Sequence, residues 1–127
     1  MLGGFAERYG MSLEHAVRAA CAFGGGVAGT AQTCGAVNGA LMVLGLAHAT
    51  GEPGNGPARQ GTYTATRSLL ERFRARHGSV TCRELLGVDI GTSEGRERAM
   101  REGLFKTRCP VFVREAAAMV GELVRAG

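Results

Sequence analysis

The sequence predicts an all-α protein, a small bundle of about five to six helices around a buried central helix at about residues 33–49. Residues 19–51 contain no Asp, Glu, Lys or Arg. Within this stretch, residues 36–49 are almost wholly apolar and rich in Ala, Leu and Met rather than β-branched residues, which favours a buried helix over a strand. The chain has 127 residues, of which 45% are hydrophobic, and this fits a single helical domain over residues 1–127.

Glycines interrupt this predicted central helix at Gly35, Gly39 and Gly45. A glycine costs about 1 kcal/mol relative to alanine inside a helix. Gly35 and Gly39 are four residues apart and share one helix face, so another backbone can approach there. Such a face suits close packing within the molecule or between subunits of a homo-oligomer.

The N-terminal part predicts two short helices. The first covers residues 2–9 and ends at Gly10, and the second begins after Ser12, a favoured N-cap residue. The apolar face of this second helix is predicted from residues at spacings of three and four: Leu13, Val17, Ala20 and Cys21. We therefore expect Cys21 to be a small buried hydrophobe.

A glycine-rich loop over residues 24–33 precedes the central helix. Gly24, Gly26 and Gly29 satisfy the G-x-G-x-x-G pattern, but the preceding segment is predicted to be helical, whereas a dinucleotide site needs a strand there. Such a loop can still present free backbone N–H groups to an anion. The nearest candidate anion is the thiolate of Cys34.

Residues 50–61 contain two prolines and four glycines and predict a loop, and the following helix runs to His77 and ends at Gly78. Its apolar stripe is predicted from residues at spacings of three and four: Tyr63, Thr66, Leu70, Phe73 and His77. The arginines of this helix lie largely on other faces and predict a solvated surface. No nucleic-acid-binding motif is present.

Two later cysteines also lie at predicted helix starts. Thr81 and Glu84 form a capping box, which makes Cys82 the first residue of a short helix ending at Gly87. A further helix is capped by Thr92 or Ser93 and continues to about residue 102. Pro110 suits the first position of the last helix, which puts Cys109 at its N-cap and Val113, Ala116, Val120 and Leu123 or Val124 on its apolar face.

Cys34, Cys82 and Cys109 thus share one predicted setting, the start of a helix. There the helix dipole and the free N–H groups favour a thiolate. Arg83 and Arg108 add positive charge beside two of them. We therefore interpret these three cysteines as a reactive or metal-ligating set, with Gly24, Gly25, Gly26, Gly35, Asn38 and Gly39 as the supporting loop and motif.

Charge and hydrophobicity indicate which partners and which cellular location to expect. The net charge of +4 is spread along the chain, which indicates solvated faces rather than a nucleic-acid surface. The N-terminus lacks the basic and long apolar parts of a signal peptide. Residues 36–49 are too few for a bilayer, which needs about 20 apolar residues, and they include Asn38 and His48. We expect a cytoplasmic protein without a membrane span.

The run Cys34-Gly35-Ala36-Val37-Asn38-Gly39, the apolar residues 40–46 after it, and the later Cys82 and Cys109 resemble the C_GCAxxG_C_C family of redox-active proteins. The approach Phe23-Gly24-Gly25-Gly26 is also typical of it, so the resemblance covers most of the chain. It implies a small helical protein that does redox work through its cysteines. The family has a further cysteine near its N-terminal helix, whose place here falls at or before Met1, so the resemblance does not carry over a mechanism with two disulfides.

Three classes of function follow. In the first, the protein is a thiol–disulfide oxidoreductase with an external redox partner: Cys34 attacks, and either Cys82 or Cys109 resolves the mixed disulfide. In the second, the three thiolates bind zinc or an iron–sulfur cluster, and the fourth ligand is a non-cysteine group such as His48 or His77, an exogenous group or a group from another subunit. The third is a structural or oligomeric helical module. A c-type haem is excluded because there is no C-x-x-C-H sequence.

Overall fold

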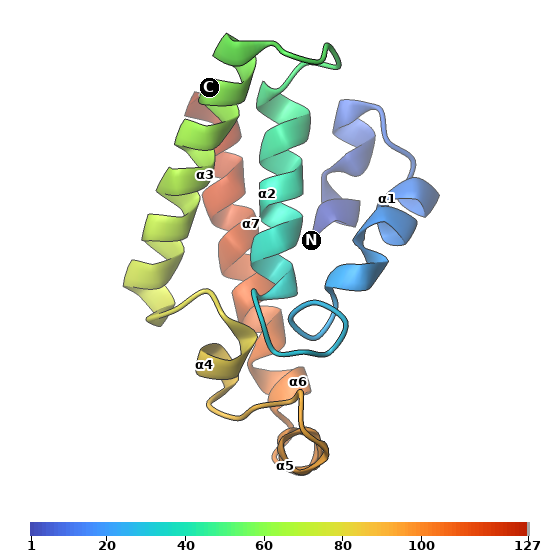
Figure 1. The fold of residues 1–127 in the computed structure, drawn as a ribbon, viewed down its shortest axis with the longest axis vertical. Helices are drawn as coiled ribbons and strands as arrows, with labels where there is room; N and C mark the ends of the chain where they lie inside the picture. Colours follow the sequence, from blue (N-terminus) through green and yellow to red (C-terminus); the bar gives the residue numbers. More distant parts are fainter. Residues whose placement is uncertain (127) are drawn as a thin grey trace.

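A computed structural model describes residues 1–126 and confirms the predicted all-α fold (Figure 1). The α-helices are α1 (Leu13–Ala20), α2 (Gly35–His48), α3 (Gly56–His77), α4 (Cys82–Leu86), α5 (Ser93–Arg101), α6 (Leu104–Thr107) and α7 (Cys109–Ala126). Short 3-10 turns add η1 (Leu2–Gly4), η2 (Ala6–Tyr9) and η3 (Cys21–Phe23). No helix in residues 1–126 combines the length and apolarity needed to cross a membrane.

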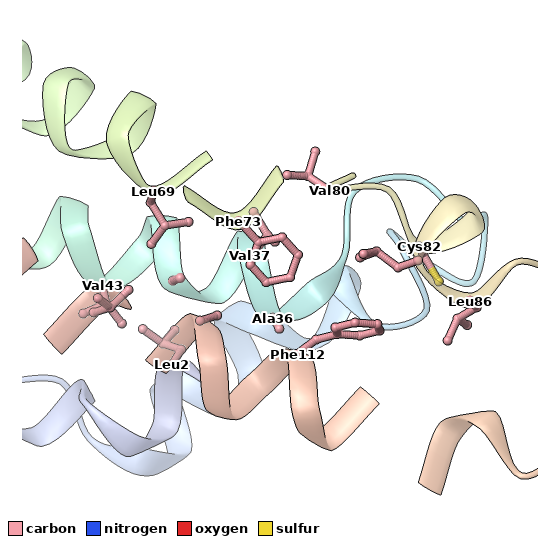
Figure 2. Close-up of a cluster of buried hydrophobic side chains, with 14 of the residues drawn as sticks. Leu2, Ala36, Val37, Val43, Leu69, Phe73, Val80, Cys82, Leu86 and Phe112 are labelled. Carbon is pink, nitrogen blue, oxygen red and sulfur yellow. The ribbon is translucent and has the colours of Figure 1, made fainter. Parts of the chain in front are cut away.

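Helix α2 is the centre of the molecule, as predicted. It packs against α3 and α7 on one side and against the N-terminal turns on the other (Figure 1). Val37, Val43 and Leu44 of α2 are fully buried, and they meet Phe73 of α3 and Val120 of α7 in one continuous core (Figure 2). Both α2 and α7 begin at the end of the bundle where α4, α5 and α6 lie (Figure 1).

The glycine face of α2 is used for close packing within the chain. A Cβ atom on Gly39 would lie 2.8 Å from Cβ of Met1, and one on Gly35 would lie 3.0 Å from the carbonyl oxygen of Phe23. These two positions therefore let the N-terminal segment lie directly on α2. At Gly45 a Cβ atom would meet nothing within 4 Å, and the structure gives no reason for that glycine.

Helix ends set by local signals lie close to their predicted positions. Ser12 accepts a hydrogen bond from the His15 amide, Thr81 accepts one from the Glu84 amide, and Thr92 accepts one from the Gly95 amide. Helix α3 begins at Gly56 with Pro57 in its first turn, and the Asn55 side chain caps it by accepting a hydrogen bond from the Ala58 amide. The N-terminal residues 2–9 form two 3-10 turns instead of one helix.

The predicted apolar face of α1 is wrong. Leu13 and Val17 are more than half exposed, Cys21 is also exposed, and Ala16 is the buried residue of this helix. The helix is amphipathic, but its small-residue side faces the protein. The spacing of apolar residues shows that this helix is amphipathic, but it does not show which side of the helix packs against the protein.

In α3 and α7, too, some buried residues differ from those predicted. In α3 the fully buried residues are Leu69 and Phe73, while Tyr63, placed in the predicted stripe, is half exposed. In α7 Phe112 takes the buried position predicted for Val113. The short α6 was not predicted, and α7 begins at Cys109 itself, so this cysteine is the first helical residue rather than the N-cap.

Candidate functional site

Two segments far apart in the sequence pair to bring Cys34 beside Cys82. Thr33 and Thr81 form an isolated antiparallel bridge. On either side of it, the Cys34 amide donates to the Val80 carbonyl at 2.8 Å, and the Cys82 amide donates to the Gln32 carbonyl at 2.6 Å. Side chains alternate between the faces of such a pair, so Cys34 and Cys82 are diagonal neighbours on one face.

The third cysteine comes from α7. Cys109 is the first residue of that helix, and the amides of Val111 and Phe112 donate to the Arg108 carbonyl just before it. Because α7 packs along α2, the starts of these two helices lie at the same end of the bundle (Figure 1). This places Cys109 opposite the paired segments.

All three cysteines line one cavity of about 200 Å³, which we call the thiol cavity. Its remaining walls come from the glycine-rich loop, the start of α2, the segment after α4 and the facing sides of α6 and α7. The lining residues are Gly25, Gly26, Cys34, Gly35, Ala36, Cys82, Ile90, Phe105, Cys109 and Val113. All the cysteines are free thiols.

The loop that walls this cavity has an unusual backbone. Residues 25–29 all have positive φ angles, from +52° to +73°, and they include the non-glycine residues Val27 and Ala28. A left-handed conformation costs roughly 1–2 kcal/mol at each non-glycine residue. The loop is held by its own hydrogen bonds, among them those from the Ala31 and Gln32 amides to the Gly25 and Gly26 carbonyls.

Gly26 is the point where this loop touches a cysteine. A Cβ atom here would lie 2.8 Å from Cβ of Cys82 and 2.6 Å from the Gln32 nitrogen. Only a residue without a side chain fits this position. The loop therefore packs its backbone directly on Cys82.

Burial dominates the ionisation of two thiols. The pKa of Cys82 is raised to about 11, first by burial and then by negative charge on Cys34, Cys109 and Asp89. The pKa of Cys109 is also raised, first by burial and then by negative charge on Cys34. The prediction that helix starts and nearby arginines favour thiolates at these two positions is therefore wrong.

The two arginines have other partners. Arg83 forms an ion pair with Asp89 at 3.4 Å, and Arg108 donates a hydrogen bond to the Leu86 carbonyl at 3.2 Å. Helix α4 has only five residues, so its dipole is small beside the cost of burying a Cys82 thiolate.

Cys34 differs in its surroundings. It is half-buried and is the N-cap residue of the 14-residue helix α2, and its side chain forms no capping hydrogen bond. The first N–H groups of a helix have no acceptor within the helix. Negative charge at Cys34 therefore has the free amides and the dipole of α2 beside it.

The predicted supporting residues have three different settings. Gly25, Gly26 and Gly35 line the thiol cavity. Gly24 and Gly39 line an adjoining cavity instead. Asn38 lines neither; its side-chain amide donates a long, 3.5 Å hydrogen bond to the Thr33 carbonyl, which steadies the segment just before Cys34.

The histidines considered as fourth ligands lie elsewhere. His48 is at the last turn of α2, away from the thiol cavity at the first turn. His77 packs against the rings of Phe73 and Phe112 and contacts the Glu115 carboxylate. Within residues 1–126, no three His, Cys, Asp or Glu side chains are arranged to hold a metal ion.

Four residues of the thiol cavity were not predicted as site residues: Ala36, Ile90, Phe105 and Val113. Ala36 belongs to the Cys34–Gly39 motif, and Val113 lies four residues after Cys109 in α7, so it shares a helix face with that cysteine. Phe105 belongs to the separate helix α6, which the sequence did not predict. No sequence signal points to Ile90, which reaches the cavity from the turn after α4.

One comparison with known proteins gives a match. A family model described as "Putative redox-active protein (C_GCAxxG_C_C)" matches residues 1–123. No curated protein and no solved structure matches the chain.

Proposed function

This chain belongs to the C_GCAxxG_C_C family of redox-active proteins, and from this we propose that it is a thiol–disulfide oxidoreductase whose attacking group is Cys34. The observation that carries the proposal is the common cavity of Cys34, Cys82 and Cys109. Disulfide exchange needs one accessible thiolate and a second thiol within reach. A cavity lined by three free thiols supplies both.

We propose Cys34 as the attacking group because burial raises the pKa of the other two thiols of the cavity. The Cys82 side chain is only 8% exposed, and burial raises its pKa to about 11. Burial also raises the pKa of Cys109. Cys34 and Cys109 are both partly exposed and both lie at the start of a long helix, but burial raises the pKa of Cys109.

The first step forms one bond and breaks one. The Cys34 thiolate attacks a substrate disulfide, a Cys34–substrate disulfide forms, and the second substrate sulfur leaves as a thiolate that takes a proton from water. In the second step, Cys82 or Cys109 loses its proton and attacks Cys34 Sγ. This releases the remaining substrate thiol and leaves an intramolecular disulfide.

The balance is a transfer of two electrons. The substrate disulfide is reduced to two thiols, and two protein thiols are oxidised to one disulfide. An external dithiol reductant returns the protein to its starting state by the same exchange in reverse. We place this cycle in the cytoplasm, where such reductants keep cysteines as thiols.

The charge on Cys34 controls the second thiol. Negative charge on Cys34 is among the causes that raise the pKa of both Cys82 and Cys109. Once Cys34 is part of a mixed disulfide, it carries no charge, so both of these pKa values fall. The attack thus removes one of the causes that keep the resolving thiol protonated, while burial, the larger cause, remains.

The test uses single serine variants and counts thiols during oxidation and re-reduction by a dithiol. Cys34→Ser should abolish reversible two-electron oxidation. Cys21→Ser is the matched control, because Cys21 is exposed and does not line the thiol cavity, and it should cycle like the wild type. Peptide mapping of the oxidised protein identifies the resolving cysteine as Cys82 or Cys109. Equal behaviour of the two variants would contradict the proposal.

A further inference from the structure

The thiol cavity has neighbours on two sides. It shares Gly35, Ala36 and Val113 with a cavity of about 230 Å³ that lies between the N-terminal segment and the starts of α2 and α7. It shares Phe105 with a cavity of about 390 Å³ formed by the α5–α6 turn. The three hollows adjoin in a row, which we call the trough, with the cysteines in its middle part.

Exposed apolar side chains are concentrated along the trough. Of the six large hydrophobic residues that are strongly exposed in residues 1–126, three line it: Met100 (67% exposed), Phe105 (36%) and Val113 (38%). Clustered exposed apolar residues mark a surface that binds a partner. These three come from separate elements, α5, α6 and α7, so no single helix face explains them.

The charge of the trough is positive at one end. Arg101 and Lys106 line the α5–α6 hollow and form no ion pair with any described residue. Glu102, the one acidic residue there, is bound to Arg98 at 2.6 Å. Two unpaired cations beside an apolar surface fit a partner that offers acidic and apolar side chains.

The middle hollow is too small for a typical bound small molecule. Sites for such ligands have volumes of roughly 300–1,000 Å³, whereas the thiol cavity has about 200 Å³. It is large enough for one side chain with a disulfide. The flanking hollows then hold the residues on either side of it.

From these observations we propose that the substrate is the disulfide of a partner polypeptide, bound as an extended segment with apolar and acidic residues beside its cysteine. This inference rests on the proposed disulfide exchange and adds the class of substrate. Apolar neighbours of the substrate cysteine contact Val113 and Phe105. Acidic neighbours lie against Arg101 and Lys106.

The test uses peptides of about nine residues, which span about 30 Å when extended. Each carries a central cysteine as its mixed disulfide with 5-thio-2-nitrobenzoate. Attack by the Cys34 thiolate forms a Cys34–peptide disulfide and releases the coloured nitrobenzoate thiolate, so the absorbance gives the rate. One peptide has leucine and aspartate around the cysteine, one has lysine and serine, and the third probe is a capped single cysteine.

We expect the leucine–aspartate peptide to react about tenfold faster than either other probe at low salt, with less advantage at high salt. Met100→Ser and Arg101→Glu should each lower the ratio of its rate to that of the capped cysteine by about fivefold. Tyr63→Ser is the matched control, because Tyr63 is half exposed but lies away from the trough, and it should leave this ratio unchanged.

A capped cysteine that reacts as fast as the leucine–aspartate peptide would assign the site to small disulfides and overturn the inference. Equal ratios in Met100→Ser and the wild type would do the same. If no probe reacts with Cys34, the proposed disulfide exchange fails. The trough is then tested alone by fluorescence anisotropy of a labelled peptide with serine in place of cysteine, where absence of binding overturns it.

Discussion

Replacing Gly26 by alanine tests how the left-handed loop supports the thiol cavity. The φ angle of Gly26 is +72°, and a Cβ atom would lie 2.6 Å from the Gln32 nitrogen and 2.8 Å from Cβ of Cys82. A non-glycine residue in this conformation costs about 1–2 kcal/mol. Overpacking of this site costs a further amount of about 1–3 kcal/mol. We therefore expect Gly26→Ala to lower the free energy of unfolding by about 2–5 kcal/mol.

Gly29→Ala is the matched control for this change. Gly29 belongs to the same loop and has nearly the same φ angle, +73°. Its Cβ atom would meet only the Arg96 guanidinium, at an ordinary 3.7 Å. This variant carries the backbone cost without the steric cost, so its loss should be about 1–2 kcal/mol.

Urea unfolding under reducing conditions measures both losses, since the midpoint and the slope together give the free energy of unfolding. The difference between the variants is the steric contribution of the contact with Cys82 and Gln32. We also expect faster alkylation of Cys82 in Gly26→Ala, because the thiol must move away from the loop. Equal stability losses in the two variants would refute the argument that the loop packs directly on Cys82.

Three further predictions follow from the same structure. Ala28→Gly should raise the free energy of unfolding by about 0.5–1 kcal/mol in the same urea experiment, because Ala28 is exposed and has a φ angle of +52°, which glycine adopts without strain. The hydrogen bond from Arg76 holds the pKa of Glu115 below its ordinary value of 4.5. The stability that this carboxylate contributes is therefore present above pH 4.5 and is lost as the pH falls below it. Glu115→Gln should reduce the loss of stability below pH 4.5 in acid-unfolding curves. Alkylation of Cys82 should remain slow at neutral pH and rise towards pH 11, and Cys34→Ser should shift that rise to lower pH, which mass spectrometry of the alkylated peptide would detect.

Helix caps were predictable because their hydrogen bonds are local. Ser12, Thr81 and Thr92 each accept a bond from an amide three residues or fewer after them. The sequence around each cap therefore contains all the atoms involved. The four-residue α6 lacked such a signal, since its N-cap is Gly103 and no side chain caps it.

The buried side of a helix was less predictable, because it depends on what packs against it. Leu13 and Val17 lie on a clear apolar stripe of α1, yet they remain exposed, and the small Ala16 faces the protein instead. Val113 of α7 follows the same pattern. It is half exposed because it borders the thiol cavity rather than the core.

The gathering of the three cysteines could be predicted, but their protonation could not. The prediction rested on their shared place at helix starts, and the starts of α2, α4 and α7 lie at the same end of the bundle (Figure 1). The sequence does not show how deeply each start is buried. At Cys82 burial outweighs the helix dipole, because desolvation of a charge in the protein interior moves a pKa by several units, whereas a helix end contributes about 0.3–1 kcal/mol.

Three thiols in one small cavity cannot all be ionised, because each negative charge raises the cost of the next. Burial is the first cause that raises the pKa of both Cys82 and Cys109, and negative charge on Cys34 is the second cause in each case. In the proposed disulfide exchange, Cys34 carries no charge once it is part of a disulfide, so this second cause is removed at both thiols. The proposed order of attack and resolution therefore depends on the three thiols sharing one cavity.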